Sequence, residues 1–212
     1  NKLQMTGADH GSVENQGNIS VGANGLAAFV APSVRNSGVI NATVGKVALA
    51  AGTTYTLDLA GDHLVELGLG SVKAVVDNSG RIVNPGGTIA LTAKAAGQVV
   101  SSVVNVSGVV SASSVSKSGG TITLGGDNIN TTATAQLSAD AGTNGNGGAI
   151  TSVANNQGNY AGSFSAKGGS ASGNGGSFET SGKNVTVADN LSVDTRAPNG
   201  ILGNWTVDPI NI

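Results

Sequence analysis

The chain has 212 residues, of which 34 are glycine, while only 10% are charged and 3% are aromatic. Glycine weakens helix interiors and the charged surface of a typical helical protein is missing, so this composition argues against a helical fold. Hydrophobic residues make up 39% of the chain and the formal net charge is −2, which excludes the weakly hydrophobic, highly charged class of disordered proteins. We therefore expect the chain to fold.

The distribution of charge also limits the partners. The ten basic residues are scattered singly along the sequence, without a basic run or stripe. Because nucleic-acid binding needs a basic footprint, we expect no nucleic-acid partner. No apolar run approaches the roughly 18 residues of a membrane-spanning helix, so we expect no transmembrane segment. The chain begins at Asn1 without a signal-peptide pattern and has no cysteine, so we expect a mature product or a fragment that is stable without disulfides.

A pattern of the form V-x-N-x-G-x-I recurs along the first half of the chain. Its copies read V-E-N-Q-G-N-I, V-R-N-S-G-V-I and V-D-N-S-G-R-I, and their asparagines are Asn15, Asn36 and Asn78. The first interval defines a 21-residue unit and the second interval is twice as long, which indicates a repeat architecture. The alternation of apolar and polar residues has the period of a β-strand. A missing copy is expected near residue 55, where Y-T-L-D-L occupies residues 55–59.

A second pattern consists of a glycine, one residue and an alternating apolar pair. Its copies begin at Gly45, Gly87, Gly120, Gly148 and Gly176. The intervals between these glycines are 42, 33, 28 and 28 residues, so after the first interval they depart from the 21-residue unit, and we expect insertions to lengthen the later turns. Residues 104–110, V-N-V-S-G-V-V, form a further copy of the first pattern with Val106 in the asparagine position.

Short strands with Gly and Asn at their corners predict that each 21-residue unit is one turn of a β-solenoid. Successive turns stack at about 4.8 Å, and inward side chains form continuous apolar columns that a single turn cannot bury alone. We expect an all-β fold with about 21 residues per turn and about 10 turns, giving a rod roughly 48 Å long. The whole of residues 1–212 is predicted to be one solenoid segment, with regular turns in 1–126 and longer Gly/Asn-rich turns in 127–212.

The repeated asparagines are predicted to have a structural role. Asparagine tolerates left-handed backbone and bonds locally, which suits a bend in the chain. At equivalent positions of stacked turns, Asn15, Asn36 and Asn78 are expected to form an amide ladder along the axis. A role in ligand binding is the alternative.

Several segments resemble a known family. Residues 30–52 read V-A-P-S-V-R-N-S-G-V-I-N-A-T-V-G-K-V-A-L-A-A-G, and residues 56–67 continue with T-L-D-L-A-G-D-H-L-V-E-L. Near the end, G-N-G-G-S-F-E-T-S-G-K covers residues 173–183 and A-P-N-G-I-L-G-N-W-T-V-D-P-I-N-I covers residues 197–212. Together these segments resemble the filamentous haemagglutinin-like exoproteins of two-partner secretion, which include the high-molecular-weight adhesins.

The resemblance implies a right-handed parallel β-helix, export through an outer-membrane β-barrel transporter, and a secreted or bacterial cell-surface location. The secretion-signal domain of this family carries N-P-N motifs, whereas residues 84–86 read N-P-G. We therefore expect the chain to lie after the core of that domain or to be a divergent member. Some adhesins of the family are glycosylated at N-x-S/T sequons, although a chain rich in Asn, Ser and Thr also produces sequons by chance. The candidate sites are Asn18, Asn41, Asn105, Asn130, Asn184, Asn190 and Asn204.

Catalytic patterns are scarce, so we expect no enzyme, no metal and no cofactor. The chain lacks the common hydrolase, nucleotide-binding and metalloprotease motifs. His10 and His63 have no cysteine partners, and Asp62 beside His63 reads as part of a solvated turn. Asp58, Asp62 and Glu66 are the only close acidic group, and the G-G-D-N-I run at residues 125–129 is a lone copy of a calcium-binding pattern that needs tandem repeats.

The sequence thus favours an adhesin segment that presents a long surface to a glycan or protein receptor on a host cell, to matrix, or to a second copy of itself. Many weak contacts along such a rod would add through multivalency. A self-associating matrix fibre is the first alternative, and a polysaccharide-active β-helix enzyme is the second. The single tryptophan, Trp205, is expected to cover the last turn.

Overall fold

The computed structural model describes residues 2–6, 10–52, 54–58, 65–67, 74–95, 102–114 and 116–209. Every helix or strand in these ranges is a β-strand, as expected for an all-β chain. In this part of the chain there is accordingly no helix long and apolar enough to cross a membrane.

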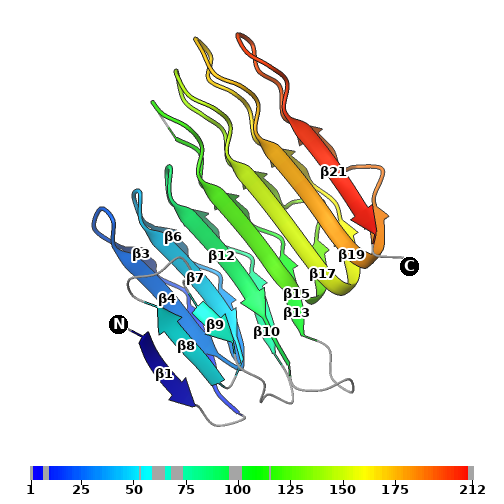
Figure 1. Cartoon of the computed structure of the whole chain (residues 1–212). Coiled ribbons are helices and arrows are strands. Elements are labelled where there is room, and N and C mark those ends of the chain that lie inside the picture. Colours follow the sequence, from blue (N-terminus) through cyan, green and yellow to red (C-terminus); the bar gives the residue numbers. More distant parts are fainter. Residues whose placement is uncertain are drawn as a thin grey trace.

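Most strands belong to a solenoid-like coil whose turns stack in chain order (Figure 1). Each turn contributes a strand, or part of a longer strand, to each of three faces, and neighbouring turns pair in parallel. The first face begins with β2 (Ser12–Asn15), β5 (Ser33–Asn36), β10 (Val75–Asn78) and β13 (Val103–Val106). The second face is β3 (Asn18–Ser20), β6 (Val39–Asn41), β11 (Arg81–Val83), β14 (Val109–Ser111), β16 (Gln136–Ser138), β18 (Ser163–Ser165) and β20 (Ser192–Asp194). The third face contains β4 (Leu26–Ala31), β7 (Lys46–Ala51), β12 (Thr88–Ala93) and β21 (Asn204–Pro209).

Three long strands join the third face to the first in the later turns. They are β15 (Thr121–Thr131), β17 (Ala149–Tyr160) and β19 (Ser177–Val187). Each starts on the third face, bends at a register shift near residues 126–128, 154–157 or 182–184, and continues along the first face. A shift of this kind inserts an unpaired residue and bends the strand, so the chain turns the corner without a separate loop.

The turns are fewer and longer than expected. In the described part of the chain a 7-stranded sheet forms the second face, which corresponds to seven turns rather than ten. The 21-residue spacing holds between Asn15 and Asn36. Later turns are longer. The interval from Asn105 to its equivalent Asn130 is 25 residues, and the interval from Asn130 to Asn159 is 29 residues. At about 4.8 Å per turn the seven strands span roughly 29 Å.

The expected repeat copy at residues 55–59 is not a turn of the coil, and this prediction was wrong. Strand β8 (Thr54–Asp58) instead pairs antiparallel with β1 (Lys2–Thr6) and β9 (Val65–Leu67) in a separate sheet. Strand β10 pairs directly with β5, so the doubled interval between Asn36 and Asn78 is one turn plus an excursion. The apolar alternation that suggested a solenoid strand is the same in an antiparallel strand.

Apolar columns fill the coil. Equivalent positions of the second face hold Ile40, Ile82, Val110, Leu137 and Phe164, all at most 1% exposed. The glycine of the first pattern is required by close stacking at the corner. A Cβ on Gly80 would lie 2.2 Å from the carbonyl oxygen of Gly38 in the preceding turn, which is far inside van der Waals contact.

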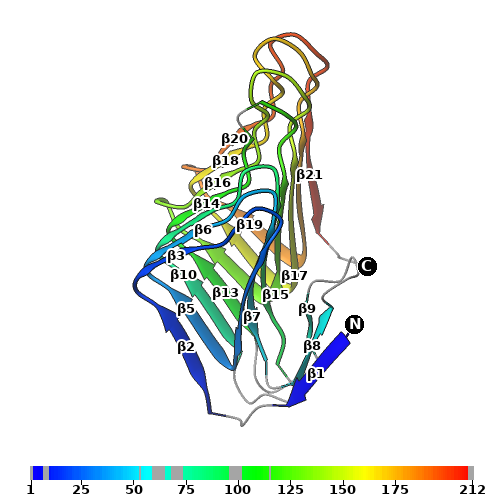
Figure 2. The same cartoon turned by 90° about the vertical axis from the view of Figure 1, so that its left-hand side faces the viewer.

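Between the second and third faces, the later turns carry long connections, described over residues 112–114 with 116–120, 139–148, 166–176 and 195–203. These connections form a ridge, called here the loop ridge, that projects at the top of Figure 2. They stack on each other as the strands do: the N–H of Gly147 donates to the carbonyl of Asn174 at 2.8 Å, and that of Gly145 to the carbonyl of Ser172 at 3.0 Å. The regular stacking of the coil therefore extends beyond the strands of its three faces into these connections.

Candidate functional site

The three repeated asparagines lie inside the coil, in register on β2, β5 and β10. Asn15 Nδ2 donates to Asn36 Oδ1 at 2.7 Å, and Asn36 Nδ2 donates to Asn78 Oδ1 at 2.7 Å. Asn36 and Asn78 are fully buried. The next turn has Val106 at the equivalent position, and Asn78 Nδ2 has no hydrogen-bond partner among the described residues. The row is closed to solvent, so its amides bond to one another rather than to a ligand.

A second set of amides lies on the outside of the coil. These residues face outward from the first face and its adjoining corner in the last four turns, and we call them the amide face. They are Asn105, Asn128, Asn130, Asn155, Asn156, Gln157, Asn159 and Asn184. Their side chains are half-buried or exposed, whereas residues between them, such as Ile129 and Tyr160, are buried in the core.

Hydrogen bonds hold the amide face in rows along the coil. Asn130 Nδ2 donates to Asn105 Oδ1 at 3.1 Å, and Asn159 Nδ2 donates to Asn130 Oδ1 at 2.8 Å. Gln157 Nε2 donates to Asn159 Oδ1 at 2.9 Å. A neighbouring row joins Asn156 Nδ2 to Asn128 Oδ1 at 3.1 Å. The side chains are thus fixed before any partner arrives.

One carboxylate lies at the corner edge of the amide face. Asp127 Oδ2 accepts hydrogen bonds from the N–H and Oγ of Ser102 at 2.8 and 3.0 Å, and Asp127 Oδ1 accepts one from Asn155 Nδ2 at 3.1 Å. Burial raises the pKa of Asp127, but these hydrogen bonds together outweigh it and lower the pKa below its ordinary value. Lys183 is exposed at the same corner one turn beyond Asn155. The two charges are opposite, so the corner has no net charge.

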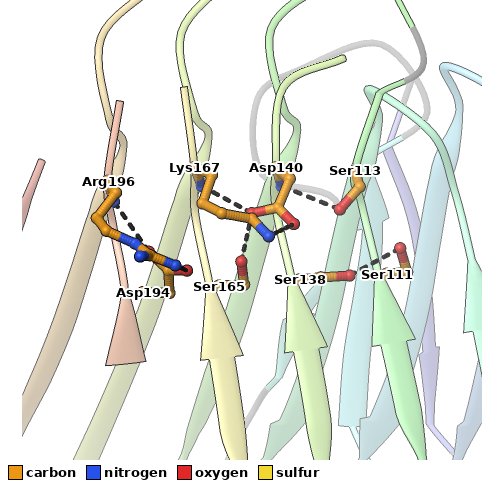
Figure 3. Close-up of polar contacts among 8 residues, drawn as sticks. All are labelled: Ser111, Ser113, Ser138, Asp140, Ser165, Lys167, Asp194 and Arg196. Atoms are coloured by element: carbon orange, nitrogen blue, oxygen red, sulfur yellow. Dashed lines mark hydrogen bonds and ion pairs between the residues drawn. The ribbon is translucent and has the colours of Figure 1, made fainter. Parts of the chain in front are cut away.

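A row of polar and charged side chains lies where the second face meets the loop ridge (Figure 3). Lys167 Nζ lies 3.7 Å from Asp140 Oδ2, and Asp140 Oδ1 accepts hydrogen bonds from Lys167 N–H and Ser165 Oγ. In the last turn Arg196 Nη2 and Nε donate to Asp194 at 2.7 and 2.9 Å. These bonds to Arg196 hold the pKa of Asp194 at about 2. Each cation of the row is paired with a carboxylate.

A groove of about 650 Å³ runs beside this row, between the stacked connections of the last three turns. Lys167 and Arg196 border it, and Ala141, Pro198 and Leu202 contribute apolar surface. Because both cations are already paired, the groove offers shape and mixed polarity rather than a strong field for an anion.

The candidate catalytic and metal-binding residues are not gathered into a site in the described structure. His10 is exposed, and Asp62 and His63 lie outside the described residues. Asp58 and Glu66 belong to the paired strands β8 and β9. Within the described ranges, no group of three or more His, Asp or Glu side chains is arranged to hold a metal ion.

The sequon asparagines are distributed over several faces. Asn18, Asn184, Asn190 and Asn204 are exposed, while Asn41, Asn105 and Asn130 are half-buried. Asn41 Nδ2 donates to Asn18 Oδ1 at 3.3 Å in the neighbouring turn. Asn105 and Asn130 both belong to the amide face, where their side chains already bond to each other.

Aromatic side chains close the interior at the last described turn. Trp205 stacks on Phe178 with ring centroids 5.7 Å apart, and Phe178 stacks on Phe164 at 4.6 Å. Trp205 Nε1 donates to Thr180 Oγ1 at 3.2 Å. Trp205 thus covers the apolar column of the last turn, while the outer edge of β21 stays open within the described residues.

The sequence did not predict the amide face or the charged row. The signal for the amide face is present as asparagine clusters at residues 105, 128–130 and 155–159. The strand register of these clusters could not be predicted from the sequence, because the later turns differ in length.

Comparison with known proteins supports the fold. No protein-family model and no curated protein matches the sequence. A similar solved structure is the HMW1 secretion domain from Haemophilus influenzae, with a TM-score of 0.52 and 20% sequence identity. The similarity covers 93% of this chain and 66% of that domain, so the chain spans just under two thirds of its length. The chain therefore shares its fold with this secretion domain.

Proposed function

We propose that this chain is a secreted or surface-exposed adhesin segment of a two-partner-secretion exoprotein, with a right-handed coil. Its role is attachment to cells or matrix, and it has no catalytic step. The observation that carries the proposal is the similarity to the HMW1 secretion domain over 93% of the chain. The similarity also fits export through an outer-membrane β-barrel transporter.

The shape of the coil supports attachment by many weak contacts. Side chains at equivalent positions repeat along the axis at about 4.8 Å, so one kind of contact can occur several times on one rod. The stacked loop ridge adds further surface along the same axis. The exposed sequons Asn18, Asn184, Asn190 and Asn204 are accessible to a glycosyltransferase, and we include their modification in the proposal.

Surface labelling of the source bacterium tests the location. Antibodies raised against the purified chain should label intact cells or the culture supernatant, and protease added outside should remove the cell-bound signal. A signal that appears only after cell lysis would overturn the proposal. Beads coated with the chain should then attach to cultured cells or matrix more than beads coated with unfolded chain, and Fab fragments of the same antibodies should prevent this.

A further inference from the structure

We propose that the amide face binds a neutral, hydroxyl-rich polysaccharide chain that lies along the coil axis. The inference rests on the proposed function and names the class of partner that this surface recognises. Three properties of the surface carry it: unused hydrogen-bonding groups, fixed spacing and lack of net charge.

The amides of the face retain groups for a ligand. A primary amide has two N–H donors and a carbonyl oxygen with two lone pairs. In the described structure Asn130 uses one donor toward Asn105 and one lone pair toward Asn159. One donor and one acceptor are therefore left at this turn. A sugar hydroxyl also donates and accepts, so each hydroxyl can pair with both groups of one amide.

The spacing of these groups suits a polymer. Asn105, Asn130 and Asn159 occupy equivalent positions in successive turns, so their free groups repeat at about 4.8 Å along the axis. This distance is comparable with the length of one pyranose unit. A linear polysaccharide can then make similar contacts at each turn, and weak contacts add because the units are linked.

The ladder bonds also reduce the cost of binding. Asn130, Asn156 and Asn159 are held by hydrogen bonds to neighbouring turns. Ordering a free side chain on binding costs conformational entropy, and side chains that are already ordered avoid most of this cost.

Charge selects among partners. From Asn105 onward the amide rows contain no ionised group, and Asp127 and Lys183 at the corner are opposite in sign. Asp77 precedes Asn105 in the same outward row and adds a negative charge there, not a cation. An anionic polysaccharide or nucleic acid gains affinity from a cluster of cations, which this face does not offer. Neutral sugars need no such cluster.

The test measures binding of the unmodified chain, made in a host without Asn glycosylation, to soluble neutral polysaccharides. Mannan, dextran, galactan and laminarin serve as neutral probes, and heparin and alginate as anionic ones, in affinity electrophoresis and calorimetry. At least one neutral probe should bind, and the double substitution Asn130→Asp with Asn159→Asp should weaken it at least tenfold. The same change at exposed Asn190, outside the amide face, should leave binding unchanged.

Circular dichroism melting separates loss of binding from loss of folding. If the double Asp variant unfolds, Asn156→Ala, which removes one exposed amide, should still weaken binding measurably. Binding to no neutral probe, binding to anionic probes alone, or equal binding by the amide-face variants would overturn the inference. Self-association through this face, seen by sedimentation and lost in the Asp variant, would also overturn it and assign the surface to a second copy. Surface labelling of cells is independent of these results, so either proposal can fail alone.

Discussion

Replacing Asn36 by valine is expected to destabilise the coil strongly. Asn36 donates to Asn78 Oδ1 and accepts from Asn15 Nδ2, both at 2.7 Å. Valine has room in this column, since Val106 occupies the equivalent position two turns later. The change leaves Asn15 Nδ2 and Asn78 Oδ1 without a good hydrogen-bond partner. Each buried group left unpaired in this way costs about 1–3 kcal/mol of stability. Asn15 Nδ2 keeps a long bond of 3.4 Å to the Val39 carbonyl. We therefore expect a loss of about 2–5 kcal/mol in the free energy of unfolding.

The same change at Asn78 should cost far less. Asn78 Nδ2 already lacks a partner among the described residues. Asn78→Val removes this unpaired group and leaves Asn36 Nδ2 unpaired in its place, so the number of unpaired donors does not change. We expect a loss below about 1 kcal/mol. The double variant with Asn36→Val and Asn78→Val should be more stable than Asn36→Val alone, because it also removes the Asn78 Oδ1 that Asn36→Val leaves unpaired.

Urea unfolding, followed by circular dichroism, measures these free energies for the wild type, both single variants and the double variant. Equal losses for the two single variants would refute the ladder as the source of the effect. So would a double variant that is less stable than Asn36→Val alone, since the ladder argument requires coupling of the opposite sign.

Further predictions concern Gly148 at the end of a loop-ridge connection, the charged row and the aromatic stack. Gly148→Ala should lower the free energy of unfolding by about 3 kcal/mol or more, because the added Cβ would lie 1.9 Å from the Gly120 carbonyl oxygen. Gly22→Ala should be near neutral, because nothing lies within 4 Å of its added Cβ. Urea unfolding compares the two variants. Asp194→Asn should lower the melting temperature much more at pH 7 than at pH 2. The folded pKa of Asp194 is about 2, below the roughly 3.9 of an unfolded chain, so its stabilisation is fully present above pH 4 and most of it is lost by pH 2, where the folded carboxyl is about half protonated. Thermal melts of both proteins at the two pH values would contradict this if the full difference persisted at pH 2. Phe178→Ala should cost about 3–5 kcal/mol in urea unfolding, and a loss below about 1 kcal/mol would argue against the stacked core.

Much of the architecture follows from local sequence patterns. The second pattern locates strands that do pair in register, because Gly45, Gly87 and Gly120 precede β7, β12 and β15, which are neighbours in the sheet. The role of the glycines at the corners of the coil could also be predicted from the sequence, because a recurring glycine marks a point where backbones approach closely.

Pairing partners were harder to predict. The segment at residues 55–59 has the alternation of a solenoid strand, yet its strand pairs antiparallel with β1, at the start of the chain. Alternation records which residues face a core but not which strand lies alongside. The number of turns was overestimated for a related reason. The first interval, between Asn15 and Asn36, is shorter than the intervals of the turns that follow.

The amide face depends on register as well. The interval from Asn105 to Asn130 differs from the interval between Asn130 and Asn159, so no fixed period aligns the three residues. Only the pairing of β13, β15 and β17 shows that they form one row. The chemistry of the amide face could therefore be inferred only after the pairing of these strands was known.

Distances between spin labels on one outward row test the stacked coil most directly. Glu14, Asn130, Asn159 and Thr186 occupy the same row in turns one, five, six and seven. The chain has no cysteine, so paired cysteines can be introduced with one label kept at Glu14. Pulsed electron resonance should give narrow distances of about 19, 24 and 29 Å to the other three positions, rising by one strand spacing per turn. Broad distances, or distances that do not rise in these steps, would contradict the coil.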